Sequence, residues 1–226
     1  MRSTWRTPDP PLLRDVTAVA AGAAVSGASF GAISTSAGLE WWVPVVMSLL
    51  VFAGGSQFMA VGVVAAGGGP VAAVLAGLVL NARHLPFGLA VGHVLGDRLS
   101  HKLLGSHLLI DESTAFALAN RHDPERARTA FWACGVTLFG AWNAAVLVGA
   151  FVGRNIGDPD AFGLDAAFPA ALLALLLPAL EDRVTRNAAL LGAAVALAAT
   201  PVLPAGVPVL LALVGLLAAA RREVGA

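Results

Sequence analysis

Residues 50–62 read LVFAGGSQFMAVG, an apolar run with Gly54, Gly55, Ser56 and Gln57 at its centre. Each glycine weakens a helix by about 1 kcal/mol relative to alanine, and the two polar side chains can bond to backbone groups that a broken helix frees. In hydrocarbon a broken helix persists only where protein buries it or where it lines an aqueous cavity. Close packing would explain the glycines alone, but it needs no amide, so the stretch indicates a broken membrane helix with a polar site.

The composition around this stretch is that of a membrane protein. The 226 residues are 58% hydrophobic and 12% charged, with mean hydropathy +0.79, whereas an ordinary soluble domain has about 25% charged residues. A formal net charge of zero argues against a nucleic-acid-binding protein, which needs clustered excess Lys and Arg. The single cysteine, Cys134, has no partner for a disulfide and no spacing typical of a metal site, so no cofactor or metal is expected.

Membrane segments of about 20 apolar residues divide the chain without room for a soluble domain. We predict one all-α transmembrane domain over residues 1–226, a polytopic inner-membrane bundle of six to eight segments, some of them broken or re-entrant. Arg2, Arg6 and Arg14 precede an apolar stretch that imitates a signal peptide, but that stretch runs to Leu39, which is too long for one. The segments lie near 16–38, 43–66, 70–95, 103–120, 129–152, 164–180, 187–200 and 203–220.

The distribution of Lys and Arg among the loops predicts the orientation. If all eight segments cross, an inside N-terminus leaves only Arg98, Lys102 and Arg154 outside. If 43–66 and 103–120 instead dip in and return, Arg98 and Lys102 also lie inside. Both arrangements place the two termini in the cytoplasm. The inside residues are Arg2, Arg6, Arg14, Arg121, Arg126, Arg128, Arg183, Arg186, Arg221 and Arg222.

A faint internal repeat relates residues 14–95 to 101–183, with extra C-terminal helices at 187–220. At an offset near 86 residues, Phe30 falls on Phe116, Gly54 on Gly140 and Gln57 on Asn143. Glycine-containing, amide-bearing second segments in both halves are typical of an inverted three-plus-three transporter repeat. Chance matches in a chain rich in Ala and Gly are the alternative.

The third segment holds polar residues between two apolar stretches. Asn81, Arg83 and His84 lie there, and Pro86 disrupts helical hydrogen bonding just after them. An arginine at the centre of a membrane helix costs roughly 2.5–3.5 kcal/mol, so Arg83 is expected to have a partner or a function. Alternatively, the helix ends near Leu80 and Arg83 extends to the interface.

Asp111 and Glu112 are the best partners for Arg83, because they are the only acids with apolar residues on both sides. A pair with one of them would leave the other carboxylate to bind and release a proton. The two acids also suit the positive end of a helix, which explains them without any transport role. No nucleophile elbow, phosphate loop or metal motif accompanies them, so we expect no enzyme.

The first segment offers a face of small residues. Gly27, Gly31 and Thr35 recur every four residues, the spacing of a close helix contact. Ser26 and Ser29 lie alongside, where their hydroxyls could contact a substrate. Packing alone explains any single one of these residues.

Residues 27–89, which include FAGGSQF and NARH, and the downstream DESTAFALA at 111–119 resemble the AzlC family of branched-chain amino acid permeases, named for azaleucine resistance. The pair Pro86 and Phe87 after RH departs from the pattern of this resemblance, which affects the local helix geometry and not the family. The resemblance implies an inner-membrane exporter of valine, leucine, isoleucine and sometimes methionine. It also implies a small partner membrane protein of the AzlD type and coupling to the proton gradient.

From the residues themselves we predict three groups of site residues in the bilayer. An uptake permease and a non-transporting membrane scaffold or assembly subunit remain the alternatives. The predicted groups are substrate-binding Gln57, Ser56, Ser29, Phe30, Asn81 and Arg83, with Phe58 and Met59 beside the apolar side chain; proton-coupling Asp111, Glu112 and His84; and helix-break or packing residues Gly27, Gly31, Gly54, Gly55 and Pro86.

Overall fold

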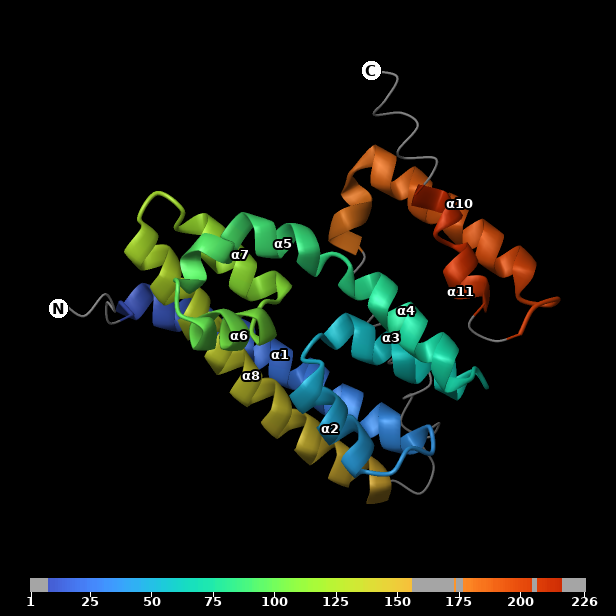
Figure 1. Cartoon of the computed structure of the whole chain (residues 1–226). Helices are drawn as coiled ribbons and strands as arrows, with labels where there is room; N and C mark the ends of the chain where they lie inside the picture. The colour runs from blue at the N-terminus through green and yellow to red at the C-terminus, as the bar shows by residue number, and fades with distance from the viewer. Residues whose placement is uncertain (1–7, 156–172, 174–176, 205–206, 217–226) are drawn as a thin grey trace. The chain divides into compact units, whose positions relative to one another are not determined.

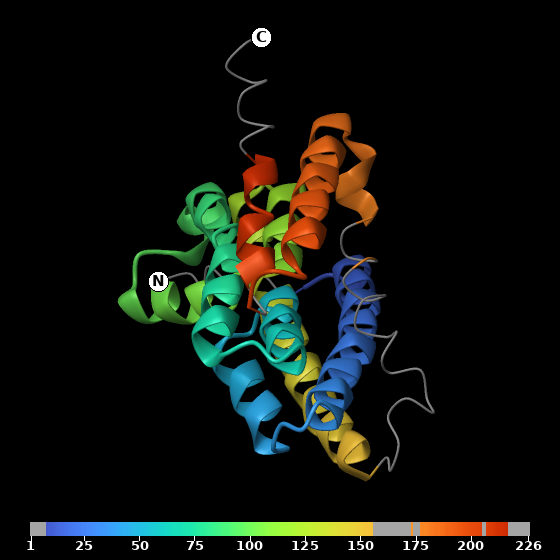
Figure 2. The same cartoon turned by 90° about the vertical axis from the view of Figure 1, so that its right-hand side faces the viewer.

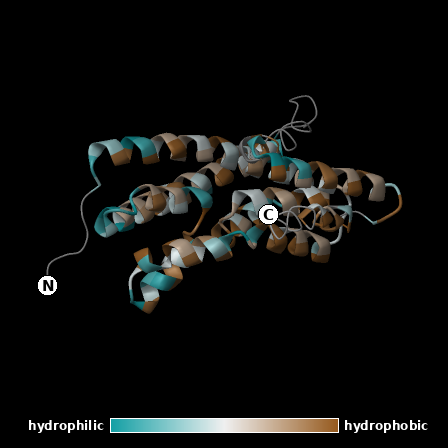
Figure 3. Ribbon diagram, turned by 90° about the horizontal axis from the view of Figure 1, so that it is seen from above, coloured by the Kyte–Doolittle hydropathy of each residue, from teal (hydrophilic) through white to brown (hydrophobic). Residues whose placement is uncertain are grey.

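A computed structural model describes residues 8–155, 173, 177–204 and 207–216, and in these ranges the chain forms helices and no strand (Figure 1). Most of the ribbon is apolar, with hydrophilic residues gathered in a few turns and helix ends (Figure 3). The elements are α1 (Pro10–Ser36), α2 (Trp42–Leu50), α3 (Gly54–Ala65), α4 (Pro70–Asn81), α5 (His84–Val91), the 3₁₀ helix η1 (Gly92–Leu95), α6 (Leu99–His107), α7 (Asp111–Ala119), α8 (Pro124–Asn155), η3 (Leu177–Glu181), α10 (Arg183–Ala199) and α11 (Val207–Leu211).

The chain divides into two compact units. The first comprises residues 1–54 and 81–159, and the second residues 55–80 and 160–226. In the second unit, α3 packs on α4 through Val63, Ala73 and Ala76, and α10 lies against α11 (Figure 2).

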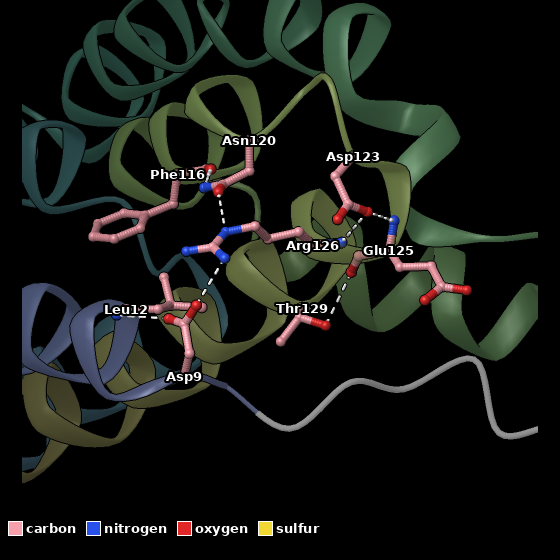
Figure 4. Close-up of polar contacts among 8 residues, drawn as sticks. All are labelled: Asp9, Leu12, Phe116, Asn120, Asp123, Glu125, Arg126 and Thr129. Carbon is pink, nitrogen blue, oxygen red and sulfur yellow. Dashed lines mark hydrogen bonds and ion pairs between the residues drawn. The ribbon is translucent and has the colours of Figure 1, made fainter.

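Helices α1 and α8 of the first unit run parallel. Each begins at an Asp-Pro pair, where the aspartate accepts hydrogen bonds from backbone N–H groups of the first turn and the proline occupies a position that needs no donor. The Oδ1 atom of Asp9 accepts from the Leu12 amide at 3.0 Å, and that of Asp123 from the Arg126 amide at 3.1 Å. The Arg126 Nη1 atom lies 2.7 Å from Asp9 Oδ2, which joins the two N-termini (Figure 4).

Small residues bring α1 and α8 into backbone contact. A Cβ added to Gly31 would collide with the Val146 carbonyl oxygen, and one added to Gly149 would collide with that of Ala28. One added to Gly27 would lie 3.0 Å from the Trp142 carbonyl oxygen. The small-residue face predicted in the first segment therefore contacts another helix of the same chain.

Helix α2 runs along the C-terminal half of α8 in the opposite direction (Figure 1). The Trp41 ring stacks on Phe151, with centroids 5.2 Å apart. Phe52, just after α2, meets Phe139 edge-on at 5.0 Å. Because Phe139 lies at the midpoint of the 32-residue helix α8, α2 extends from one end of α8 only to its middle.

Helices α6 and α7 form a hairpin along the N-terminal half of α8. His101, near the start of α6, lies against Trp132 with ring centroids 6.0 Å apart, and His107 at its end lies 5.5 Å from Phe139. Helix α7 then returns, because Asn120 after its last turn accepts a 2.7 Å hydrogen bond from Arg126 at the start of α8. The hairpin thus begins and ends at the same end of α8.

The break in the second predicted segment lies before the glycines and not at them. Residues 51–53 separate α2 from α3, and Phe52 has φ +40°, a left-handed conformation that is uncommon for a bulky residue. Gly54 and Gly55 form the first turn of α3. A Cβ at Gly54 would lie 2.8 Å from the Trp142 ring, so close packing is the physical reason for this glycine.

Pro86 likewise does not end a helix. It occupies the first turn of α5, where its missing N–H removes no helical hydrogen bond. The chain breaks at residues 82–83, after α4 ends at Asn81.

Three described stretches are long and apolar enough to cross a membrane by length and composition: Pro10–Ser36, Pro70–Leu95 and Pro124–Asn155. The chain is accordingly an all-helical protein with candidate membrane-spanning helices. The total of six to eight segments and the repeat stay predictions. Most of the segment predicted near 164–180, and the end of the one near 203–220, lie outside the described residues.

Candidate functional site

Three helix breaks of the first unit meet near the middle of α8. The break at 51–53 lies there because Phe52 contacts Phe139. The break at 108–110 lies one turn away, since a Cβ on Gly135 would touch Leu108 at 3.0 Å. The break at 82–83 is joined to it by an ion pair between Arg83 and the start of α7. Inside a membrane, broken helices are tolerated only where protein buries them or where they line an aqueous cavity.

Arg83 and Asp111 form the predicted ion pair. The Arg83 Nη2 atom lies 3.0 Å from Asp111 Oδ2, and the two side chains are 37% and 45% exposed. Arg83 immediately precedes α5, and Asp111 is the first residue of α7. A positive and a negative side chain therefore face one another where two half-helices begin.

Ser113 holds the turn that positions these acids. Its Oγ accepts a 3.0 Å hydrogen bond from the Ile110 amide and donates one of 2.8 Å to the Leu108 carbonyl oxygen. The turn places Asp111 and Glu112 in the first turn of α7, where negative charge is favourable. Sequence reasoning missed Ser113, because the usual capping signal has Ser or Thr at the N-cap and Glu or Gln three residues later, whereas here the N-cap is Ile110 and the serine is the third helical residue.

Buried polar atoms without hydrogen-bond partners among the described residues lie beside the ion pair. They are Asn81 Oδ1, Arg83 Nε and Thr114 Oγ1. Thr114, which is 3% exposed, follows Asp111 by three residues and so lies on the same face of α7. Buried polar groups are normally hydrogen-bonded, so these three atoms retain unused hydrogen-bonding capacity beside the ion pair. Nothing in the sequence marked Thr114.

The predicted proton-coupling residues lie in this region, but they do not bond to one another. Glu112 is half-buried and makes no ion pair within the described part of the chain. The His84 Nδ1 atom lies 3.0 Å from the Asn81 carbonyl oxygen, and its ring meets Phe87 edge-on at 5.9 Å. His84 is therefore fixed to its own turn.

Other predicted residues lie elsewhere. The Ser29 hydroxyl donates to the Val25 carbonyl oxygen at 3.0 Å within α1, and fully buried Phe30 stacks on Trp142 in the contact with α8. Ser56 and Gln57 are buried in α3, where Gln57 belongs to the second unit. Their part in one site with Arg83 stays a prediction.

Phe52, His107 and Phe139, which sequence reasoning did not combine, come together from three separate elements at the middle of α8. No spacing signal could relate them, because α2, α6 and α8 are distant in sequence. Across residues 8–155, 173, 177–204 and 207–216, no three His, Cys, Asp or Glu side chains are grouped as a metal site requires.

Comparison with known proteins gives a family match over more than half of the chain, including residues of both units. The family model described as AzlC protein matches residues 18–156. The chain is 31% identical over 156 residues to "Inner membrane protein YgaZ" of Escherichia coli strain K12, covering 67% of this chain and 61% of that one. It is 31% identical over 174 residues to an uncharacterized membrane protein of Archaeoglobus fulgidus, covering 75% and 74% of the two chains.

The chain is also 27% identical over 173 residues to an uncharacterized membrane protein of Helicobacter pylori strain J99. The match covers 75% of each chain. No solved structure matches the chain.

Proposed function

The chain belongs to the AzlC family, and from that premise we propose that it is a secondary transporter that exports branched-chain amino acids. Its substrates are valine, leucine and isoleucine, with methionine as a further candidate. We place it in the bacterial inner membrane with both termini in the cytoplasm. Its relatives, each described as a membrane protein, support the membrane location.

The observation that carries this proposal is the Arg83–Asp111 pair at the helix breaks. An amino acid presents a carboxylate and an ammonium group a short distance apart. Arg83 presents planar donors suited to a carboxylate, and its Nε has no partner among the described residues. Glu112, without an ion pair in the described chain, is a suitable partner for the ammonium group.

With this arrangement, inward movement of protons would drive outward movement of the amino acid. Ionised Glu112 holds the ammonium group, and a proton arriving from outside neutralises the carboxylate and releases the substrate. Proton and substrate then exclude one another at one carboxylate, so an inward proton exchanges for an outward amino acid. Asp111 remains with Arg83 and keeps that arginine at the break.

Cells fed a valine-containing dipeptide test the role of Arg83. Wild-type protein, expressed with its partner, should lower internal valine, and Arg83→Ala should abolish the effect because the substrate carboxylate loses its partner. Arg83→Lys should retain only part of it, since an ammonium group lacks the planar fork. Exposed Arg98→Ala is the matched control. Undiminished valine loss from Arg83→Ala at equal expression would contradict the assignment.

We further propose that a small membrane protein of the AzlD type assembles with this chain. In the alternative of a non-transporting scaffold or assembly subunit, the small-residue faces only bind neighbouring helices, and Gly27 and Gly31 are needed for complex formation. The face of Gly27 and Gly31 instead contacts α8 of the same chain. No observation in the described residues favours the scaffold, and uptake differs from export only in direction.

A further inference from the structure

Three aromatic rings close the middle of the first unit. Phe52 and Phe139 meet edge-on with centroids 5.0 Å apart, and His107 meets Phe139 at 5.5 Å. Phe52 and His107 are 6.2 Å apart with a tilt of 38°. The spacings are those of favourable aromatic pairs, so each ring contacts the other two. We call these residues the aromatic triad.

The aromatic triad lies where half-helices from opposite ends of the unit stop. Helix α2 starts beside Phe151, at the C-terminal end of α8, whereas α6 starts beside Trp132, near its N-terminal end. Both end at the level of Phe139. In many transporters, helices interrupted near the middle of the membrane form the substrate site, and such breaks are tolerated only where protein buries them or they line an aqueous cavity. A path that followed both half-helices would be blocked at the triad.

The backbone of Phe52 supports a role beyond filling space. Its φ of +40° is a conformation that bulky residues rarely adopt, and such conformations persist where the surroundings enforce them, often at functional sites. The strained turn directs a 4% exposed ring onto His107 and Phe139. Glycine would adopt this φ without strain, yet the chain places a bulky ring here in contact with His107 and Phe139.

We propose that the aromatic triad is the constriction of the transport path and that its ring sizes determine which side chains pass. This inference rests on the proposed function, since it assumes that an amino acid crosses this unit. Branched aliphatic side chains pass between the rings, and the larger tryptophan side chain is excluded. The His107 nitrogens and the ring faces offer transient partners to the ammonium or carboxylate group of the substrate.

Vesicles containing the purified chain and its partner test the constriction through a ratio of substrates. Exchange of radiolabelled tryptophan is divided by that of leucine for each variant, so incomplete reconstitution cancels. Phe139→Ala should raise the tryptophan-to-leucine ratio by about tenfold or more, the scale of discrimination that a change of pocket size provides. His107→Phe should keep the low wild-type ratio, because a ring of similar size remains. Phe151→Ala, on the same helix but outside the triad, is the control.

Three outcomes would contradict either the constriction or the proposed function. An equal ratio in Phe139→Ala and Phe151→Ala would overturn the inference while leaving the proposed function in place. A raised ratio in His107→Phe would also overturn it. Absence of leucine exchange by the wild type would instead overturn the proposed function, and the inference with it. If Phe139→Ala does not fold, Phe139→Leu supplies the comparison with a smaller expected increase.

Discussion

An arginine within an apolar segment must be paired or reach water, and Arg83 is paired with Asp111 at 3.0 Å where two half-helices begin. In the proposed mechanism this pair gives Asp111 and Glu112 different roles although they are neighbours. Asp111 is engaged by the guanidinium group, whereas Glu112 makes no ion pair in the described chain. We therefore propose Glu112 as the carboxylate that exchanges a proton for an ammonium group.

Glu112→Gln should separate transport from proton coupling. The amide can still accept a hydrogen bond from an ammonium group but cannot take up a proton. Leucine efflux from vesicles should therefore stop responding to an imposed pH gradient, while leucine–leucine exchange continues. In the wild type, acid on the outside should accelerate efflux. The control is Glu125→Gln, exposed in the first turn of α8; a pH response retained in Glu112→Gln would exclude this carboxylate.

At the scale of elements, the first, third and fifth predicted segments coincide with the three described stretches that are long and apolar enough to cross a membrane, whereas the break of the second is displaced. The first and fifth predicted segments are the continuous helices α1 and α8. The second was expected to break at Gly54 and Gly55, but it breaks at 51–53. Sequence patterns measure local helix preference, whereas this break depends on contacts of Phe52 and Gly54 with α8, far along the chain.

The same limit applies to the candidate site. Arg83 and its acidic partner could be predicted because charges in apolar segments are conspicuous. Ser113, Thr114 and the aromatic triad could not, since Ser, Thr and Phe are ordinary residues in such helices. Their importance comes from a capped turn, an unbonded buried hydroxyl and rings assembled from three elements.

The contact between α1 and α8 predicts that alanine substitutions at two glycines of α1 change the stability of the protein in opposite directions. Gly31→Ala should destabilise the protein by about 1–3 kcal/mol, because its Cβ would collide with the Val146 carbonyl oxygen. Gly22→Ala meets nothing within 4 Å and should stabilise it by about 0.5–1 kcal/mol through helix preference. Thermal unfolding in detergent measures both. Equal shifts for the two variants would contradict the close approach.

At the scale of the whole molecule, the arrangement within the first unit bears on topology. The hairpin of α6 and α7 starts and finishes at the end of α8 where Arg126 joins Asp9. Arg98 and Lys102, at the start of the hairpin, then lie with the other basic loops. This favours the arrangement in which 103–120 dips in and returns, and it strengthens the charge asymmetry that predicts cytoplasmic termini.

Cysteine labelling tests this topology. In a Cys134→Ala background, Ser100→Cys should be protected from a membrane-impermeant reagent added to intact cells and should react in inside-out vesicles. His122→Cys, cytoplasmic in both arrangements, should behave in the same way, and Glu40→Cys should react in intact cells. Reaction of Ser100→Cys in intact cells would instead show that 103–120 crosses the membrane.

The central claim is that this chain moves a branched-chain amino acid in exchange for protons. Purified protein should be reconstituted with its AzlD-type partner into vesicles loaded with radiolabelled leucine, and an inward proton gradient should be imposed. We predict leucine efflux faster than in protein-free vesicles, faster with the gradient than without it, and abolished by Arg83→Ala. Efflux equal to that of protein-free vesicles under every gradient would contradict the account.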